Sequence, residues 1–271
     1  MAAVFASAPA DLGGICVRSP AGPVRDAWLA ALRARFPTAT PIRRVPVQVS
    51  ESRLLGGLDL TATLATGKPV AERGLLSECD GGIAIVVSAE RMPAGTAAQF
   101  SAALDSGVVV VERDGIALRL PARFGIVLLD EGIDDLEMPP ASLVDRCTFL
   151  LDLTTLCTRD ITDAPEGTAP MNAAVGSESP ADTHRFSAAI LESDEAIATL
   201  TYAAHELGVT GLRAPLLALK AARRHAAFIG RTCIGDDDVS FAARAVLAPR
   251  ATTLPTAEAA DAGEPESAAD T

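Results

Sequence analysis

The sequence predicts an α/β domain followed by a small helical domain, and three observations lead to this fold class. Residues 14–17 form a short apolar strand, a turn rich in Pro and Gly follows, and residues 24–36 have the apolar spacing of a helix, with Pro23 suited to its first position. Residues 83–87 form a continuous apolar run, which is typical of a buried parallel strand. After residue 160 only helical patterns follow. Strand, turn and helix in this order open an α/β nucleotide-binding fold.

The rest of the α/β part consists of short elements between turn residues. Asp59 is expected to cap a helix over 59–65, and Asp114-Gly115 to form the turn of a β-hairpin over 108–120. The other expected elements are an extended polar stretch at 38–57, helices at 74–79, 96–104 and 141–147, and strands at 124–129 and 148–153.

Four regions follow along the chain. They are an α/β core (1–159), a linker rich in Pro, Gly and Ser (160–185), a helical lid domain (186–250) and a disordered acidic tail or the start of a linker (251–271). Helices are expected at 187–207, 211–230 and 236–247, the last capped by Asp236-Asp237-Asp238. This order of core and lid is common in P-loop ATPases of the AAA+ type, so the fold expected is a parallel AAA+ sheet with an inserted β-hairpin.

Composition limits the function classes. The 271 residues include 23 basic and 35 acidic side chains, a balance of −12, which argues against binding nucleic acid or anionic membranes. Apolar residues make up 49 % and aromatic residues only 4 %, so a core of Ala, Val, Leu and Ile is expected. No apolar run approaches the length of a membrane span, and the first ten residues lack a positive signal-peptide region. We therefore expect a cytoplasmic protein.

Cysteine and histidine show no metal-binding pattern. The five Cys are odd in number and form no CxxC pair, so we expect small buried side chains in a reducing compartment. The three His show no ligand spacing and are expected to be lone surface or packing residues. No metal site is predicted.

The first strand–turn–helix unit is where a P-loop, G-x-x-x-x-G-K-[ST], belongs. There Ser19 stands at the first Gly, Val24 at the second, Arg25 at the Lys and Asp26 at the hydroxyl residue. Pro20 and Pro23 remove two N–H donors that a phosphate needs, and Asp26 sets a negative charge against it. Ser19, Gly22 and Arg25 remain as the residues of a weak, degenerate nucleotide loop.

Two other segments imitate ATPase motifs. Thr66-Gly67-Lys68 resembles the end of a P-loop, but it follows a helix and Pro69 comes next. Residues 127–131 form an apolar run that ends in Asp130-Glu131, like a Walker B motif that holds Mg²⁺. Because this run comes late in the chain, the favoured interpretation is a strand end with solvated carboxylates.

Several longer stretches resemble magnesium chelatase, a family in the chelatase branch of the AAA+ proteins. They are Glu-Ser-Arg-Leu-Leu-Gly-Gly from residue 51, residues 71–82, and Ser-Gly-Val-Val-Val-Val-Glu-Arg-Asp-Gly from residue 106 to Pro-Ala-Arg-Phe at 121–124. The family inserts Mg²⁺ into protoporphyrin IX for chlorophyll and bacteriochlorophyll synthesis, as a ligase. It has a small active ATPase of the I type, a larger D-type chain with a related AAA+ module, and a porphyrin-binding H-type chain. The degenerate loop resembles the D type.

The resemblance implies roles for several residues. Ser88 falls at the Walker B position, and Asp130-Glu131 falls near sensor 1, so both catalytic signatures are lost. Arg146 matches a candidate arginine finger that acts in trans, and Arg213 matches a sensor 2 arginine. The family then implies an ATPase-inactive chain that assembles in a ring with the I-type ATPase, with the H-type chain as an indirect partner. ATP and Mg²⁺ would be held mainly by the partner ATPase.

Other interpretations stay open. Each arginine is also explained by a surface ion pair or by the charge at a helix end. The chain is alternatively a self-sufficient MoxR-like ATPase or chaperone in which Arg25 replaces the Lys, or a purely structural scaffold. D-type chains normally continue into an integrin-I-like domain, whereas no Asp-x-Ser-x-Ser metal motif occurs here. The sequence is expected to be the N-terminal module of a longer protein or a shorter member of the family.

Overall fold

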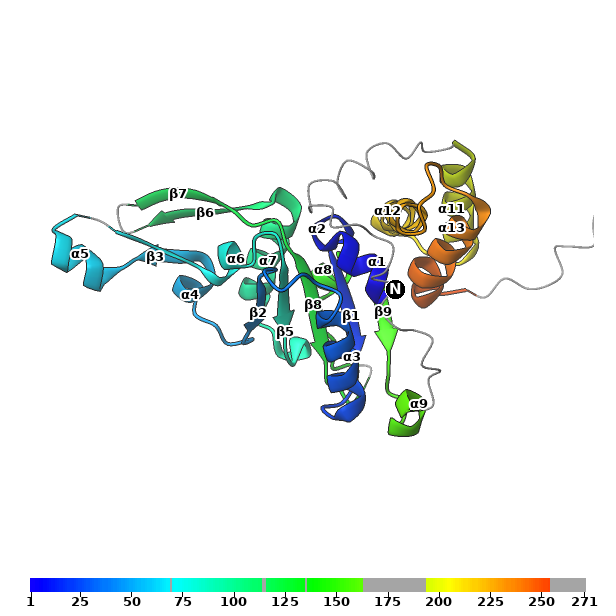
Figure 1. The fold of residues 1–271 in the computed structure, drawn as a ribbon, viewed down its shortest axis with the longest axis horizontal. Helices are drawn as coiled ribbons and strands as arrows, with labels where there is room; N and C mark the ends of the chain where they lie inside the picture. The colour runs from blue at the N-terminus through cyan, green and yellow to red at the C-terminus, as the bar shows by residue number, and fades with distance from the viewer. Residues whose placement is uncertain (69, 114–115, 135, 163–193, 254–271) are drawn as a thin grey trace, which may run out of the picture.

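A parallel β-sheet with helices on both faces forms the centre of the molecule (Figure 1). The structure is a computed structural model, and it describes residues 1–68, 70–113, 116–134, 136–162 and 194–253. The strands of the sheet are β1 (Gly14–Arg18), β2 (Ile42–Val45), β5 (Ile83–Val86), β8 (Gly125–Asp130) and β9 (Phe149–Asp152). Their order is β2-β5-β8-β1-β9, and every neighbouring pair is parallel. This confirms the predicted fold class.

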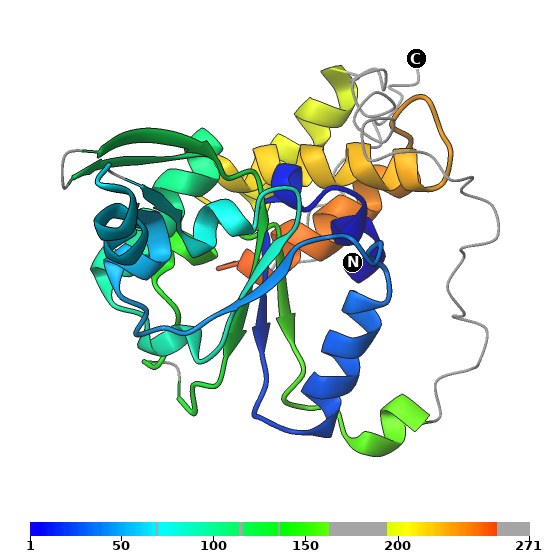
Figure 2. The same cartoon turned by 60° about the vertical axis from the view of Figure 1, so that its left-hand side comes forward.

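Alternation along the strands divides the core into two layers. In β1, Ile15 and Val17 face one side, whereas Cys16 faces the other. The first side packs against α3 (Pro23–Arg33), and Figure 2 shows this helix running along that face of the sheet. The other side is covered by α4 (Glu51–Leu55), α6 (Leu75–Glu78), α7 (Ala94–Ser106) and α8 (Ala141–Val144). Period-two alternation therefore places both helical layers.

Aromatic residues fill more of the core than the composition suggested. Phe5, Phe100, Phe124 and Phe149 are among the largest fully buried side chains. Phe100 and Phe124 meet edge to face, with ring centroids 6.3 Å apart. The expectation of a core of Ala, Val, Leu and Ile was incomplete, because these four Phe side chains also fill it, whereas Tyr202 and Phe228 are exposed.

The helical part lies beyond the amino ends of the strands, in the upper right of Figure 1. It contains α11 (Asp194–Glu206), α12 (Arg213–Phe228) and α13 (Asp236–Ala242), followed by a π-helical turn (Ala243–Leu247) and a 3-10 turn (Ala248–Arg250). As predicted, acidic residues begin α13: the Asp238 side chain accepts a hydrogen bond from the Gly235 N–H at 2.9 Å. Buried alanines of α12 allow close packing, and its core is continuous with the α3 side of the sheet.

Two short N-terminal helices, α1 (Ala2–Ser7) and α2 (Pro9–Leu12), join the two parts and were not predicted. Asp11 in α2 accepts a hydrogen bond from Arg224 Nε at 2.9 Å, and Lys220 Nζ lies 3.6 Å from the other carboxylate oxygen. Arg250 donates to the carbonyl oxygens of Cys147 and Thr148 near the start of β9. These contacts hold the helical part against the edge of the sheet at which β1 and β9 begin.

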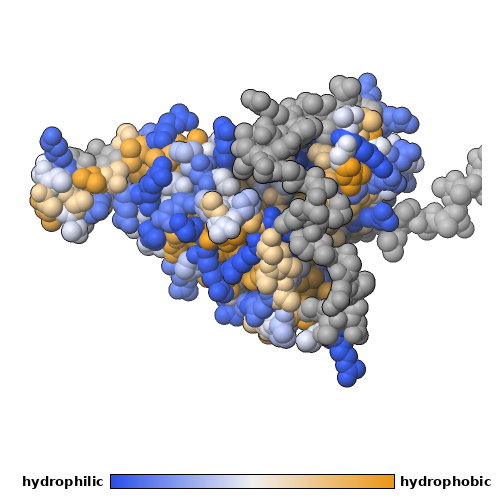
Figure 3. Space-filling model, in the orientation of Figure 1, coloured by the Kyte–Doolittle hydropathy of each residue, from blue (hydrophilic) through white to orange (hydrophobic). Residues whose placement is uncertain are grey.

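A projecting arm extends to the left in Figure 1. It consists of α5 (Leu60–Thr66) and two antiparallel ribbons, β3 (Gly56–Leu58) with β4 (Ala71–Arg73), and β6 (Val108–Arg113) with β7 (Ile116–Pro121). Hydrophobic side chains gather in small patches on this arm in Figure 3. The predicted hairpin is confirmed by the pairing of β6 and β7, although Asp114-Gly115 lies outside the described residues.

Side-chain caps begin two short helices, one that was predicted and one that was not. Asp59 caps α5 as expected, by accepting a hydrogen bond from the Ala62 N–H at 2.9 Å. The segment that resembles the end of a P-loop, Thr66-Gly67-Lys68, is the C-terminal end of this helix, where Gly67 adopts a φ of 66°. The extended stretch predicted at 38–57 was wrong at α4, because Ser50 caps a helix there by accepting from the Arg53 N–H.

The predicted linker and tail fall mostly outside the described residues. A short helix, α9 (Thr158–Thr162), is described before residue 163, and α11 is described from Asp194. A 3-10 turn, Ala89–Arg91, follows β5. No helix in the described part of the chain is both long and apolar enough to cross a membrane.

Candidate functional site

The loop between β1 and α3 holds the three residues predicted as a degenerate nucleotide loop. Ser19 is buried, and its N–H donates to the Asp130 carbonyl oxygen at 2.9 Å, which ties the loop to the end of β8. Gly22 precedes α3 in an extended conformation, and nothing lies within 4 Å of where a Cβ would stand. Arg25, in the first turn of α3, is 7 % exposed. The loop is thus folded against the sheet.

Arg25 forms an ion pair with Glu131, the residue that follows β8. The second oxygen of Glu131 accepts a hydrogen bond from Ser88 Oγ at 3.2 Å. The Glu131 N–H donates to Glu90 at 3.0 Å. The parallel order of β5, β8 and β1 brings these side chains to one edge, because the carboxyl ends of parallel strands lie together. Three positions that the family resemblance connects with ATP chemistry therefore meet.

The carboxylates of Asp130 and Glu131, at the end of β8, are not solvated strand-end groups, so that interpretation was wrong. Asp130 is 2 % exposed, lies 3.4 Å from Arg18, and accepts a hydrogen bond from the Gly132 N–H at 2.9 Å. Glu131 is held by Arg25 and Ser88. Both carboxylates therefore bind side chains of this chain: Arg18 and Ser88 come from neighbouring strand ends, and Arg25 comes from α3.

Arg146 and Arg213 lie together on a single carboxylate, that of Asp105 in the last turn of α7. Arg146 donates from Nε to Asp105 Oδ1 at 2.9 Å and from a terminal nitrogen to Oδ2, so the pair is bidentate. Its other terminal nitrogen donates to the Ser142 carbonyl at 2.6 Å. Arg213 reaches Asp105 Oδ1 at 3.4 Å and Asp145 at 2.9 Å. The lid helix α12, α7 and the segment after α8 therefore share one ion-pair cluster.

The hydrogen bonds of this cluster shift the ionisation of its members. Hydrogen bonding from Arg146 lowers the pKa of Asp105, and Arg213 adds to this effect. The hydrogen bond to Asp105 raises the pKa of Arg146. The alternative of a surface ion pair thus describes both arginines in the isolated chain.

The arginine cluster and the degenerate loop lie at opposite edges of the sheet. Gly13, just before β1, is so close to Arg146 that a Cβ there would collide with the Arg146 carbonyl oxygen. Ser19 follows β1 at its other end. At roughly 3.3 Å per residue, these two positions are about 20 Å apart. Arg146 and Arg213 are therefore brought together, but neither is brought to Arg25.

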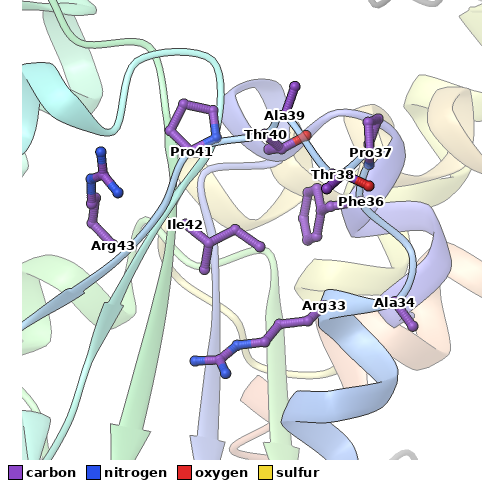
Figure 4. A pocket seen from close by; sticks show the side chains of 10 residues that line it. All are labelled: Arg33, Ala34, Phe36, Pro37, Thr38, Ala39, Thr40, Pro41, Ile42 and Arg43. Atoms are coloured by element: carbon purple, nitrogen blue, oxygen red, sulfur yellow. The ribbon is translucent and has the colours of Figure 1, made fainter.

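A surface hollow of about 670 Å³ lies between the end of α3 and β2 (Figure 4). Arg33 and Arg43 are the charged residues that line it. None of the predicted site residues lines it. A smaller hollow of about 230 Å³ lies beside Arg25 and Arg44.

The described histidines and cysteines form no metal-binding group. His225 stacks on Phe241 with ring centroids 4.3 Å apart, and its Nδ1 lies 2.6 Å from Asp238. His184 lies outside the described residues. Cys16, Cys79 and Cys147 are buried as predicted, whereas Cys157 and Cys233 are exposed, so the prediction was wrong for these two.

Sequence reasoning missed Asp105 and did not pair Glu131 with Arg25. Asp105 stands near the end of a helix in a segment that carries no motif, so the sequence offered no signal for it. For Glu131 a signal existed, because a parallel strand that ends in Asp-Glu delivers its carboxylates to the same edge as the loop after β1.

Comparisons with known proteins match this chain to an AAA lid domain and to subunits of magnesium chelatase. The family model described as AAA lid domain matches residues 197–269. The Magnesium-chelatase 60 kDa subunit of Cereibacter sphaeroides is 37 % identical over 261 residues, which are 95 % of this chain and 40 % of that protein. The Magnesium-chelatase 67 kDa subunit of Chlorobaculum parvum is 30 % identical over 92 % of this chain and 41 % of that protein. The chain therefore spans about two fifths of the length of these relatives.

A shorter relative is covered more fully. The Magnesium-chelatase 38 kDa subunit of Cereibacter sphaeroides is 30 % identical, over 81 % of this chain and 70 % of that protein. A solved structure, described as a candidate ATPase from Cytophaga hutchinsonii, superposes with a TM-score of 0.64 at 15 % identity. It covers 90 % of this chain and 78 % of that one, which shows a shared fold.

Proposed function

The chain belongs to the magnesium-chelatase family, in the branch of the larger D-type chains, and we propose that it is the AAA+ module through which such a chain supports ATP-dependent insertion of Mg²⁺ into protoporphyrin IX. Here Mg²⁺ is the substrate of the assembled enzyme. The pathway served is chlorophyll or bacteriochlorophyll biosynthesis. The chain acts as a non-catalytic or regulatory part of a ligase.

In this proposal the chain does not hydrolyse ATP at its own loop. The residues present there do not fit a nucleotide phosphate: Arg25 is neutralised by Glu131, and Asp26 adds a negative charge. Ser88 stands where a Walker B carboxylate would hold Mg²⁺, and its hydroxyl is occupied by Glu131. ATP and its Mg²⁺ are held mainly by a partner ATPase.

The partner is the smaller, I-type ATPase of magnesium chelatase, in a ring. Sequence similarity supports this proposal: the chain is itself 30 % identical to a 38 kDa chelatase subunit over 81 % of the chain. Because the two modules are related, the surfaces through which they contact neighbours are also related. This chain can therefore occupy a position next to the I-type ATPase in the ring. The H-type chain, with its porphyrin, is reached indirectly through this ring.

The observation that carries the proposal is the separation of the two arginines from the broken loop. An arginine finger stabilises charge on a phosphate that a neighbouring protomer holds. Arg146 and Arg213 lie together at the edge of the sheet opposite to Arg25, and both reach Asp105. A chain can complete a neighbour's site from that edge without a working site of its own.

The first experiment mixes the chain with the purified I-type ATPase and measures the mass of the complex by light scattering, with and without ATP. We expect a large complex that depends on nucleotide. Metal insertion is then measured with Arg146→Ala. At the sites that this chain completes, loss of a finger is expected to slow turnover by about 10³-fold.

Arg231→Ala is the control for loss of an exposed arginine that lies elsewhere in the helical part. Arg231 pairs with the exposed Asp237 and also, at 3.2 Å, with the buried Asp238, so the melting temperature of this variant is measured as well. The variant is expected to leave metal insertion unchanged. Full activity of the Arg146→Ala complex would contradict the role in trans. Steady ATP hydrolysis by the isolated chain would contradict the inactive loop and favour the MoxR-like alternative.

A further inference from the structure

Asp105 occupies the place between Arg146 and Arg213 where an anionic ligand would be expected. Its two oxygens take the side of the Arg146 guanidinium formed by Nε and one terminal nitrogen, and Oδ1 also meets Arg213 at 3.4 Å. This is the fork geometry with which arginine binds carboxylate and phosphate alike. The Asp105 carboxylate thus binds the two nitrogens of the Arg146 guanidinium that would also suit a phosphate.

The charges of this cluster cancel. Arg146 and Arg213 contribute two positive charges, and Asp105 and Asp145 contribute two negative ones. Arg146 is only 16 % exposed, because Asp105 and the Ser142 carbonyl hold it against the surface. In this arrangement the arginines offer a neighbouring protomer neither net positive charge nor a free guanidinium.

The position of Asp105 in its helix favours its release. It lies in the last turn of α7, which Gly107 follows as the C-cap with a φ of 68°. A carboxylate at the C-terminal end of a helix is repelled by the carbonyl dipoles there. The two arginines compensate for this repulsion. Asp105 is also 45 % exposed, so water can solvate its carboxylate when the arginines leave.

We propose that Asp105 is an internal substitute for phosphate that keeps Arg146 and Arg213 paired until the polyphosphate of a nucleotide on an adjacent protomer displaces it. This inference rests on the proposed function, since it concerns the same two arginines. The ligand class is a nucleoside triphosphate presented by a neighbour. Phosphate competes successfully because it carries more charge than a carboxylate and offers more acceptor oxygens.

Binding of inorganic tripolyphosphate by the whole chain tests the proposal without a partner. Calorimetry compares the unchanged chain with Asp105→Asn, which keeps the shape of the side chain and removes its charge. We expect Asp105→Asn to bind tripolyphosphate about tenfold more tightly. The double variant Asp105→Asn/Arg146→Ala should lose this gain, which assigns the binding to the freed arginine.

Asp237→Asn is the charge-matched control, because it also removes one negative charge from an exposed aspartate–arginine pair. It should leave tripolyphosphate affinity unchanged. An equal gain with Asp237→Asn would show a general effect of net charge and would overturn the proposal. A melting temperature of Asp105→Asn close to that of the unchanged chain verifies that the variant is folded.

The assembled complex provides the second measurement. With Asp105→Asn, the ATP concentration that gives half-maximal metal insertion should fall several-fold, because no internal carboxylate competes. A rise, or no change, overturns the inference and leaves Asp105 as a structural residue. The result for Arg146→Ala is read separately: if that variant is fully active, the proposed function fails, whereas loss with Arg146→Ala and no effect of Asp105→Asn removes only the present inference.

Discussion

Arg25 and Glu131 form an ion pair that joins the first turn of α3 to the end of β8, at the position that the lysine of a P-loop would take. The Arg25 side chain is 8 % exposed and the Glu131 side chain 25 %. A charge buried to this extent needs its partner, since an uncompensated buried ion loses its hydration without a substitute. The degenerate loop is thus a structural contact of this chain.

Removing Glu131 should therefore destabilise the fold. We expect Glu131→Ala to lower the free energy of unfolding by about 2–4 kcal/mol, because Arg25 stays buried without its carboxylate. Urea denaturation measures the change. Replacing both members, as in Arg25→Met/Glu131→Leu, should recover most of the loss, since no buried charge remains. A double variant that is less stable than Glu131→Ala would show that the pair itself contributes the stability.

The contact between α2 and α12 should make stability depend on acidic pH. Burial raises the pKa of Asp11, but hydrogen bonds and charges from Arg224 and Lys220 lower it more, so the pKa lies below its ordinary value of 3.8. The contribution of Asp11 is therefore present above this value and is lost as the pH falls below it.

Asp11→Asn tests this contact. At pH 7 we expect a loss of about 1–3 kcal/mol, the usual effect of removing a charged hydrogen-bond partner. The difference between variant and unchanged chain in urea denaturation should shrink as the pH is lowered below 3.8. A difference that stays constant down to the acid transition would assign the loss to packing of α2.

The five thiols should divide into two reactivity groups. Burial raises the pKa of Cys16 and of Cys79 to about 12, and it raises the pKa of Cys147 well above the usual range. Cys157 and Cys233 are exposed. Because the thiolate is the reactive form, a thiol reagent at about pH 8 should modify the two exposed cysteines quickly and the three buried ones only after unfolding. Mass spectrometry of the native chain counts the labels.

Gly13 should be intolerant of any side chain. Its φ is 70°, and a Cβ would collide with the Arg146 carbonyl oxygen. We expect Gly13→Ala to cost about 1–3 kcal/mol in unfolding free energy and to displace the backbone of Arg146. Gly22→Ala is the control, since Gly22 is extended and no atom lies within 4 Å of its Cβ position. Equal loss in both variants would mean that the close approach at Gly13 is relieved easily.

Local patterns in the sequence were sufficient for most elements of the fold. The apolar run that became β5, the cap at Asp59 and the acidic start of α13 act over a few residues, so propensity and hydrogen bonding to the nearest N–H groups decide them. The same local reasoning missed α1 and α2, which are short helices held by tertiary packing, and it overlooked the Ser50 cap that begins α4. It also showed that Arg25 stands where a P-loop has Lys, because that difference is a change of residue type.

The partners of the charged side chains were decided only when the chain folded. Arg25 and Glu131 are 106 positions apart, Arg146 and Asp105 are 41 apart, and Arg213 and Asp105 are 108 apart. No local pattern specifies such pairs, since each depends on strand order and on where the lid helix docks. The amino-acid sequence thus identified which residues stand at the motif positions of the family it resembles. Because parallel strands begin at one edge of the sheet and end at the other, the tertiary structure decided that Arg146 and Arg213 lie at the edge opposite to the loop that contains Arg25.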